Sequence, residues 1–171
     1  MPSAKRGERG SMLIEFTLVG IPLVLILISL FEISIAMWNY HMLAYAVRED
    51  ARYASTKGQG CTYSGNTCGV TVANVAQQIA SAGVGLVPSQ LNVTLTSSGG
   101  NITCNPLSSC YSNTATWPPN SGTANWPGSV ISITGSYPVQ TGLVFSYFIH
   151  TGLLQLQSVT LPASSQQVIQ F

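Results

Sequence analysis

The sequence predicts an α+β protein, in which a long N-terminal transmembrane helix carries a small lobe made of an antiparallel sheet and a helix. Two observations lead to this prediction. An apolar stretch runs from Ser11 to Trp38, and helix-forming sequence without Pro or Gly continues from Asn39 to Lys57. After Gly58 come one short helical pattern and several segments in which apolar and polar residues alternate.

We divide the chain into a leader at residues 1–10, a transmembrane and stalk helix at 11–57 and a lobe at 58–171. The uncharged run between Glu15 and Glu32 is 16 residues long, which is short of the roughly 20 that cross a bilayer. Adding its apolar flanks makes it long enough and places both carboxylates near the two membrane faces. The whole helix would measure about 70 Å, so only its first part can lie in lipid.

The charges of the chain are confined to its first third. All six Lys and Arg and all five Asp and Glu lie in residues 1–57, and residues 58–171 contain none, whereas about 25% is usual in globular domains. A lobe without acids cannot form a Ser-His-Asp set, and no glycine-rich phosphate loop is present. His150, next to Ile149, is expected to be structural. These features argue against an enzyme, a bound cofactor and a nucleic-acid partner.

The four cysteines form two close pairs in the lobe, Cys61 with Cys68 and Cys104 with Cys110. We expect two disulfides, each closing a short loop and adding about 2 to 3 kcal/mol. The alternative is a metal site, but zinc pairs are usually spaced more tightly and no histidine lies nearby in the sequence. Disulfides imply an oxidising compartment, so the lobe is expected outside the cytoplasm.

The basic residues of the leader agree with this orientation. Lys5, Arg6 and Arg9 flank the apolar run closely, which favours a cytoplasmic N-terminus. An ordinary secretory signal would end its apolar core at a site resembling A-x-A, and none follows here. The helix is therefore expected to remain as an anchor.

Within the lobe, a helix should begin after Thr71 as its N-cap and stop at Gly83. Its buried face should consist of four apolar residues: Val72, Val75, Ala76 and Ile79. Three strands are expected at residues 91–96, 131–137 and 155–161, the second stopped by Pro138, and residues 167–171 are compatible with a fourth. Residues 97–128 are rich in Ser, Asn, Gly and Pro, which predicts a long surface excursion. The apolar segment 143–154 fits either a helix or a packed loop.

Two tryptophans in this excursion each precede a proline, Trp117 before Pro118 and Trp126 before Pro127. We expect both to pack across their own loop. The alternative is an exposed aromatic contact patch.

The helical part of the chain resembles TadE-like proteins, which are pseudopilins or minor pilins of the tight-adherence (Flp) pilus system. Three segments carry the resemblance: Arg9-Gly10-Ser11-Met12-Leu13-Ile14-Glu15-Phe16, then Pro22 with Phe31-Glu32, and finally Arg48-Glu49-Asp50-Ala51-Arg52-Tyr53-Ala54. The family usually shows R-E-G-A-R-Y-A at the last of these. Asp50 stands where that glycine is expected, a departure that should only favour continued helix.

The resemblance implies that a prepilin peptidase cleaves between Gly10 and Ser11, which makes Glu15 the fifth mature residue. Glu15 would then pair with the new N-terminal amine of a neighbouring subunit, although a plain helix-start acid is the simpler interpretation. Glu32 would reach the outer headgroups or a partner helix. Arg48 and Arg52 lie one turn apart, on a face that is either solvated or used for docking.

The resemblance also implies partners and a location. The partners are the peptidase, an inner-membrane assembly platform, other pseudopilins, the major pilin and membrane lipid. The location is the bacterial inner membrane, crossed once, with the lobe periplasmic or at the cell surface. The expected function is support of pilus assembly or initiation. The alternatives are a pseudopilin of a type II secretion or type IV pilus system, and a membrane-anchored binding module that uses residues 97–128.

Overall fold

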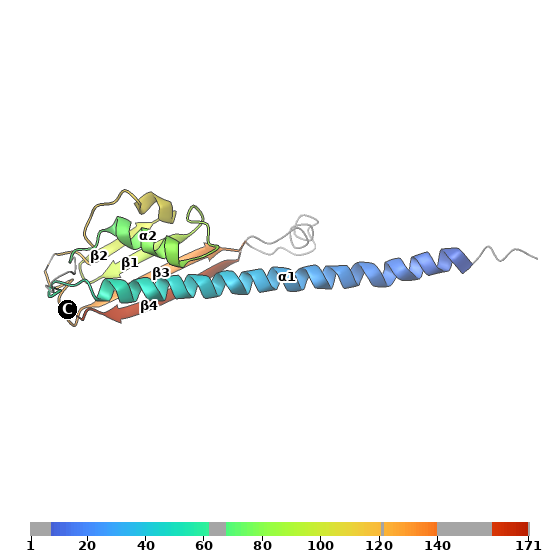
Figure 1. Ribbon diagram of the computed structural model, residues 1–171, viewed down its shortest axis with the longest axis horizontal. Coiled ribbons are helices and arrows are strands. Elements are labelled where there is room, and N and C mark those ends of the chain that lie inside the picture. The colour runs from blue at the N-terminus through green and yellow to red at the C-terminus, as the bar shows by residue number, and fades with distance from the viewer. Residues whose placement is uncertain (1–7, 62–67, 121, 140–158, 171) are drawn as a thin grey trace, which may run out of the picture. The chain divides into compact units, whose positions relative to one another are not determined.

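The computed structural model describes residues 8–61, 68–120, 122–139 and 159–170 (Figure 1). The apolar segment 143–154, His150 and the first residues of the strand expected at 155–161 lie outside these ranges. The chain divides into two compact units, Met1–Ala36 with Thr141–Gln157 and Met37–Gln140 with Ser158–Phe171. The fold is α+β, as predicted: a long helix, a second helix and one antiparallel sheet.

Helix α1 spans Glu8–Ser55 and is continuous over 48 residues, close to the range 11–57 expected from the sequence. In its first part the described apolar side chains are exposed, for example Phe16 at 78% and Phe31 at 70%. Among the described helices, α1 is the one that is long and apolar enough to cross a membrane. Because an exposed apolar surface of this length is unfavourable in water, this segment is a candidate membrane anchor.

The last two fifths of α1, from Met37 on, belong to the second unit, and the helix packs there on the sheet. The buried positions recur at helical spacing: Leu43, Ala46, Val47, Asp50, Ala51 and Ala54. A Cβ atom added to Gly135 would lie 2.9 Å from Cδ1 of Leu43 and 3.0 Å from Cγ2 of Val47. The missing side chain of Gly135 therefore allows the helix to approach the sheet closely.

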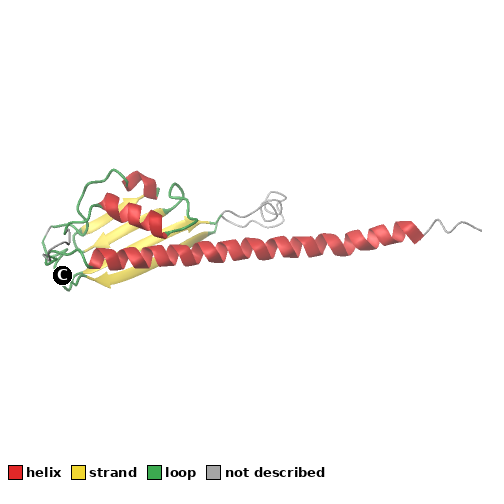
Figure 2. Ribbon diagram, in the orientation of Figure 1, coloured by secondary structure: helices red, strands yellow, loops and turns green. Residues whose placement is uncertain are grey.

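Helix α2 spans Val72–Ala82 and matches the prediction closely. The backbone N–H of Asn74 donates to Oγ1 of Thr71 at 3.2 Å, so Thr71 is the N-cap. The C-cap is Gly83, and the buried residues are the four expected: Val72, Val75, Ala76 and Ile79. In Figure 2, α2 and the C-terminal part of α1 overlie the strands of the sheet.

The sheet contains four antiparallel strands in the order β2-β1-β3-β4. Strands β1 (Asn92–Ser97) and β3 (Val130–Pro138) form its centre and bury alternate residues against the helices. Both were predicted, and Pro138 ends β3 as expected. The core contains Leu95 and Ile133, which pair in register and are each at most 1% exposed.

The prediction of a long surface excursion at residues 97–128 is wrong for residues 100–104 and 107–110, which form regular elements, and for Trp117, which is bonded to the rest of the lobe. Residues Gly100–Cys104 form strand β2, which pairs with β1 through a tight turn. Residues Leu107–Cys110 form a 3₁₀ helix. Further on, the N–H of Trp117 donates to the carbonyl oxygen of Val70 at 2.8 Å. The segment is therefore hydrogen-bonded to the residues at the start of α2. Its polar composition predicted a loop, although it forms short elements that are paired with the rest of the lobe.

The two strands expected at residues 155–161 and 167–171 form one strand over the described residues, β4 (Thr160–Val168), which overlaps the end of the first and the start of the second and includes the stretch between them. Its Pro162 made a strand improbable from sequence. In the structure, Ile169 donates to Ser129 and Val139 donates to Val159 through backbone groups. Odd-numbered residues of β4 therefore bond to β3, and Pro162 faces away from it. Because β4 is an edge strand, no strand pairs with it on the side that Pro162 faces. The missing N–H of Pro162 therefore removes no hydrogen bond from the sheet.

Candidate functional site

The residues that the family resemblance singled out begin in the first turns of α1. Gly10 and Ser11 lie within the helix, and Glu15 follows one turn after Ser11 with an exposed side chain. Residues four apart lie about 6 Å apart along the axis and on the same face. A carboxylate at Glu15 is thus placed close to the position where cleavage after Gly10 would create an amine.

A shallow apolar hollow of about 390 Å³ adjoins Glu15 along α1. Its lining residues are Phe16, Thr17, Gly20, Ile21, Val24 and Leu25. Gly20 lines it without a side chain, and a Cβ at that position would make an ordinary van der Waals contact, 3.8 Å from Cε1 of Phe16. Small residues in transmembrane helices allow a second helix to approach closely, so this surface is suited to helix packing.

Glu32 lies 17 residues beyond Glu15, or about 26 Å along the same helix, and is half-buried. Its Oε2 atom is buried without a hydrogen-bond partner within the described part of the chain. A carboxyl group with an unmet hydrogen bond in an apolar segment calls for a partner outside it. This is compatible with the expected partner helix, but that role stays a prediction.

Arg48 and Arg52 are both exposed, and Glu49 lies between them. The Nη1 atom of Arg52 is 3.9 Å from Oε2 of Glu49, with side chains 65% and 44% exposed. A pair so open to water contributes little to stability. The acid does reduce the repulsion expected between the two arginines, and both remain accessible on α1.

Asp50 is a buried acid that the sequence did not reveal. Its side chain is fully buried, and neither carboxylate oxygen has a hydrogen-bond partner among the described residues. Burial raises the pKa of Asp50 from 3.8 to about 8, because a charge without a partner is disfavoured in the core. The expectation that Asp50 only favours continued helix is therefore incomplete: the helix continues, but with a carboxyl group inside the lobe. The sequence contains one sign of this difference, because Asp50 stands where the family usually has glycine.

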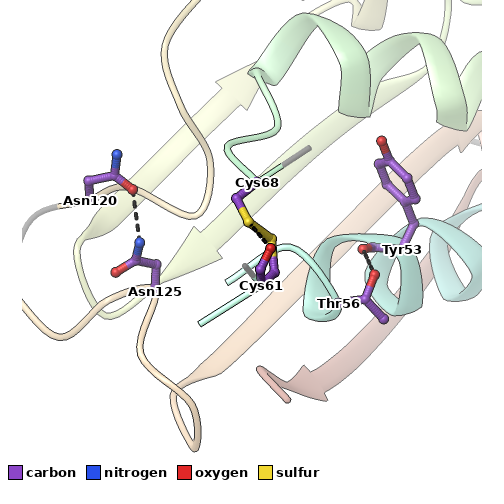
Figure 3. The surroundings of a disulfide bond; sticks show 6 residues. All are labelled: Tyr53, Thr56, Cys61, Cys68, Asn120 and Asn125. Atoms are coloured by element: carbon purple, nitrogen blue, oxygen red, sulfur yellow. Dashed lines mark hydrogen bonds between the residues drawn. A yellow bond between two sulfur atoms is a disulfide. The ribbon is translucent and has the colours of Figure 1, made fainter. Parts of the chain in front are cut away.

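Both disulfides expected from the spacing are present, Cys61–Cys68 and Cys104–Cys110. Figure 3 shows the first, which lies near the end of α1 and near Asn120 and Asn125. There, Nδ2 of Asn125 donates to Oδ1 of Asn120 at 2.8 Å. Within the described ranges, no group of three His, Cys, Asp or Glu residues is placed to hold a metal ion.

A polar pocket of about 360 Å³ adjoins this disulfide. Its lining residues are Lys57, Gly58, Gln59, Cys68, Gly69, Thr116, Pro118, Asn120 and Asn125. Lys57 lies with its Nζ atom 5.5 Å from the ring centre of Tyr53, an arrangement favourable for a cation above an aromatic face. The described lining carries amides, a hydroxyl and an amine, groups that donate and accept hydrogen bonds.

The two tryptophans behave differently. Trp117 is fully buried in the main core rather than packed across its own loop, and its Nε1 has no hydrogen-bond partner within the described ranges. Trp126 is 50% exposed. An aromatic contact patch made of both residues is therefore excluded, and only Trp126 is available at the surface.

Comparison with known proteins gives one finding, which concerns α1. The family model described as TadE-like protein matches residues 10–52. No curated protein and no solved structure matches the chain. The matched residues include Gly10, Ser11, Glu15, Glu32 and Asp50, and the match ends before the sheet. This family is a structural family of pilus systems and not a family of enzymes. The resemblance read from the sequence is thus confirmed for this part of the chain, and residues 10–52 are a TadE-like segment.

Proposed function

We propose that the chain is a membrane pseudopilin that supports the assembly or initiation of an adhesive Flp-type pilus. The observation that carries this proposal is the TadE-like match over residues 10–52 on a single helix whose first part has an exposed apolar surface. The family connects the chain with tight-adherence pilus systems. A specific role in assembly, and the partners named above, are the proposal.

The mechanism begins with removal of the leader between Gly10 and Ser11. The new ammonium group would enter the membrane boundary together with Glu15 of another subunit. Burying either charge alone costs desolvation free energy, and pairing of the two charges in low dielectric offsets both costs. The hollow around Gly20 lies within two turns of Glu15, so packing of a partner helix there would bring the two charges into register.

Glu32 gives this helix a second point of contact. Its Oε2 atom lacks a hydrogen-bond donor, and a polar group on an adjoining transmembrane helix would supply one. Arg48 and Arg52 lie beyond the membrane on the exposed side of α1. They are available to an acidic surface on the assembly platform or a related subunit.

The experiment compares two carboxamide variants in the native host. Glu15→Gln should stay inserted, because removing a charge makes lipid entry easier, but it should recruit fewer partner subunits and reduce the number of pili. Glu49→Gln is the matched control, since it removes a charge from the same helix outside the membrane segment. Normal piliation in Glu15→Gln, with normal protein level, would contradict the pairing role.

The nearest alternative is a pseudopilin of a type II secretion or type IV pilus system. Genetic loss of the chain separates the alternatives, because it should abolish Flp-type pili in one case and protein secretion or type IV pili in the other. Loss of secretion with intact Flp-type pili would replace the proposal by this alternative.

A further inference from the structure

The face of the sheet turned away from the helices carries an ordered array of uncharged polar side chains. Two registered rows cross all four strands. The first row is Thr103, Thr94, Thr134 and Ser164; the second is Asn101, Thr96, Ser132 and Gln166. All eight side chains are exposed or half-buried.

The hydroxyl groups of the first row lie close to one another. Oγ1 of Thr94 is 3.5 Å from Oγ1 of Thr103, and Oγ1 of Thr134 is 3.4 Å from Oγ of Ser164. Neighbouring strands are about 4.8 Å apart, and successive rows about 7 Å apart. Since Thr is β-branched and stiff at χ1, the hydroxyls are held in a regular pattern before any ligand arrives.

This pattern differs from an ordinary solvated sheet face by its lack of charge. Residues 58–171 contain no Asp, Glu, Lys or Arg, although surfaces normally contain both signs. Hydroxyl and carboxamide groups can each donate and accept hydrogen bonds. The array therefore suits a ligand that offers many donors and acceptors together and has no charge of its own.

These properties discriminate among the possible occupants. An ordinary protein surface would place its charged groups against a face that cannot pair with them, at a desolvation cost. Nucleic acid and anionic lipid would lack the cations that bind them. A second copy meeting the same face would bury these eight polar side chains, and the exposed aliphatic pair Val130 and Val168 at one end of the face is small beside the apolar layer that normally holds two sheets together.

We infer that this face binds an uncharged polysaccharide, with the chain of sugars lying along the rows. The strand spacing is comparable with the length of one sugar ring in an extended polymer, so successive rings would meet successive strands. Thr94 and Thr134 lie at the centre of the first row, on the two middle strands. They are the residues through which the ligand would be recognised. This inference is independent of the pilus role.

The test measures depletion of the full chain, in detergent micelles, by three uncharged solids: cellulose, chitin and cross-linked dextran. At least one should bind it, and raising the salt concentration should not release it, because no charges take part. Carboxymethyl-substituted dextran should bind no better than plain dextran.

Variants locate the binding on the array. The double variant Thr94→Val/Thr134→Val keeps the β-branched shape and removes two hydroxyls, so binding should weaken about tenfold or more. Thr114→Val is the matched control, because Thr114 is exposed but lies outside the sheet; its binding should be unchanged. Ser164→Lys on the exposed edge strand should also weaken binding, and it needs no change in the sheet interior.

Three results would overturn the inference. They are no binding to any of the three solids, equal binding by the double variant with an unchanged thermal transition, and self-association of the chain that the double variant abolishes without any polysaccharide binding. The last result would assign the face to contact between copies of the chain.

Discussion

Replacing Asp50 with Asn should change how the stability of the lobe depends on pH. The folded pKa of about 8 exceeds the unfolded value of 3.8, so the folded chain holds a proton that the unfolded chain releases. The free energy of unfolding should therefore be greatest below about pH 4 and fall as pH rises towards 8. At pH 7 the difference is about 3 pKa units, or about 4 kcal/mol of lost stability.

Asp50→Asn keeps the shape of the side chain and cannot ionise. The variant should match the parent chain near pH 4, be more stable at pH 7 to 8, and lose the slope between these values. The amide stays buried without a partner, as the protonated acid does, so this cost of about 1 to 3 kcal/mol is common to both chains and does not change the difference between them. Denaturant unfolding of the full chain in micelles, followed by tryptophan fluorescence, gives both the stability and its pH profile.

Glu49→Gln is the control for this experiment, because Glu49 is the preceding acid and its side chain is 44% exposed. It should shift stability by less than about 0.5 kcal/mol at any pH. If Asp50→Asn kept the full pH slope of the parent chain, Asp50 would not be the buried proton-binding group and the reasoning would fail.

Three further changes test the packing of the lobe. Cys104→Ser with Cys110→Ser should lower the free energy of unfolding by about 2 to 3 kcal/mol, measured by denaturant; no loss would mean that the bridge does not form in the native chain. Gly135→Ala should cost about 1 to 3 kcal/mol, because its Cβ would lie 2.9 Å from Cδ1 of Leu43, and an unchanged melting temperature would argue against the close helix–sheet approach. Trp126→Ala should change stability by about 0.5 kcal/mol or less, since the side chain is 50% exposed; a large loss would mean that the tryptophan is packed.

The elements with strong local signals could be predicted from the sequence. Thr71 and Gly83 define α2 because capping is decided by a few neighbouring atoms. The alternation around Leu95 defines β1 because one face of the strand is buried. The length and apolar character of α1 likewise follow from its own residues.

The remaining elements depend on tertiary partners. Strand β2 is five residues long and begins at a glycine, so only its pairing with β1 makes it a strand. Strand β4 contains Pro162, whose acceptability depends on its place at the sheet edge. The burial of Asp50 depends on which face of α1 packs against the lobe, and this face is not evident from the sequence. An aspartate in a helix is usually exposed to solvent.

The candidate site divides in the same way. The roles proposed for Gly10, Ser11 and Glu15 come from the family resemblance, which rests on a local motif. The hydroxyl array could not be seen in the sequence, since it arises from the register of four strands, two of which were missed or divided.

The most direct test of the central claim is the mass of the mature chain isolated from the native envelope, with its N-terminal peptide sequenced. Cleavage between Gly10 and Ser11 should leave Ser11 as the first residue and Glu15 as the fifth, with α1 retained. Gly10→Leu should leave a heavier, membrane-bound precursor. A mature N-terminus beyond Phe31 would show that the helix is removed as a secretory signal, and it would contradict the account of a membrane-anchored pseudopilin.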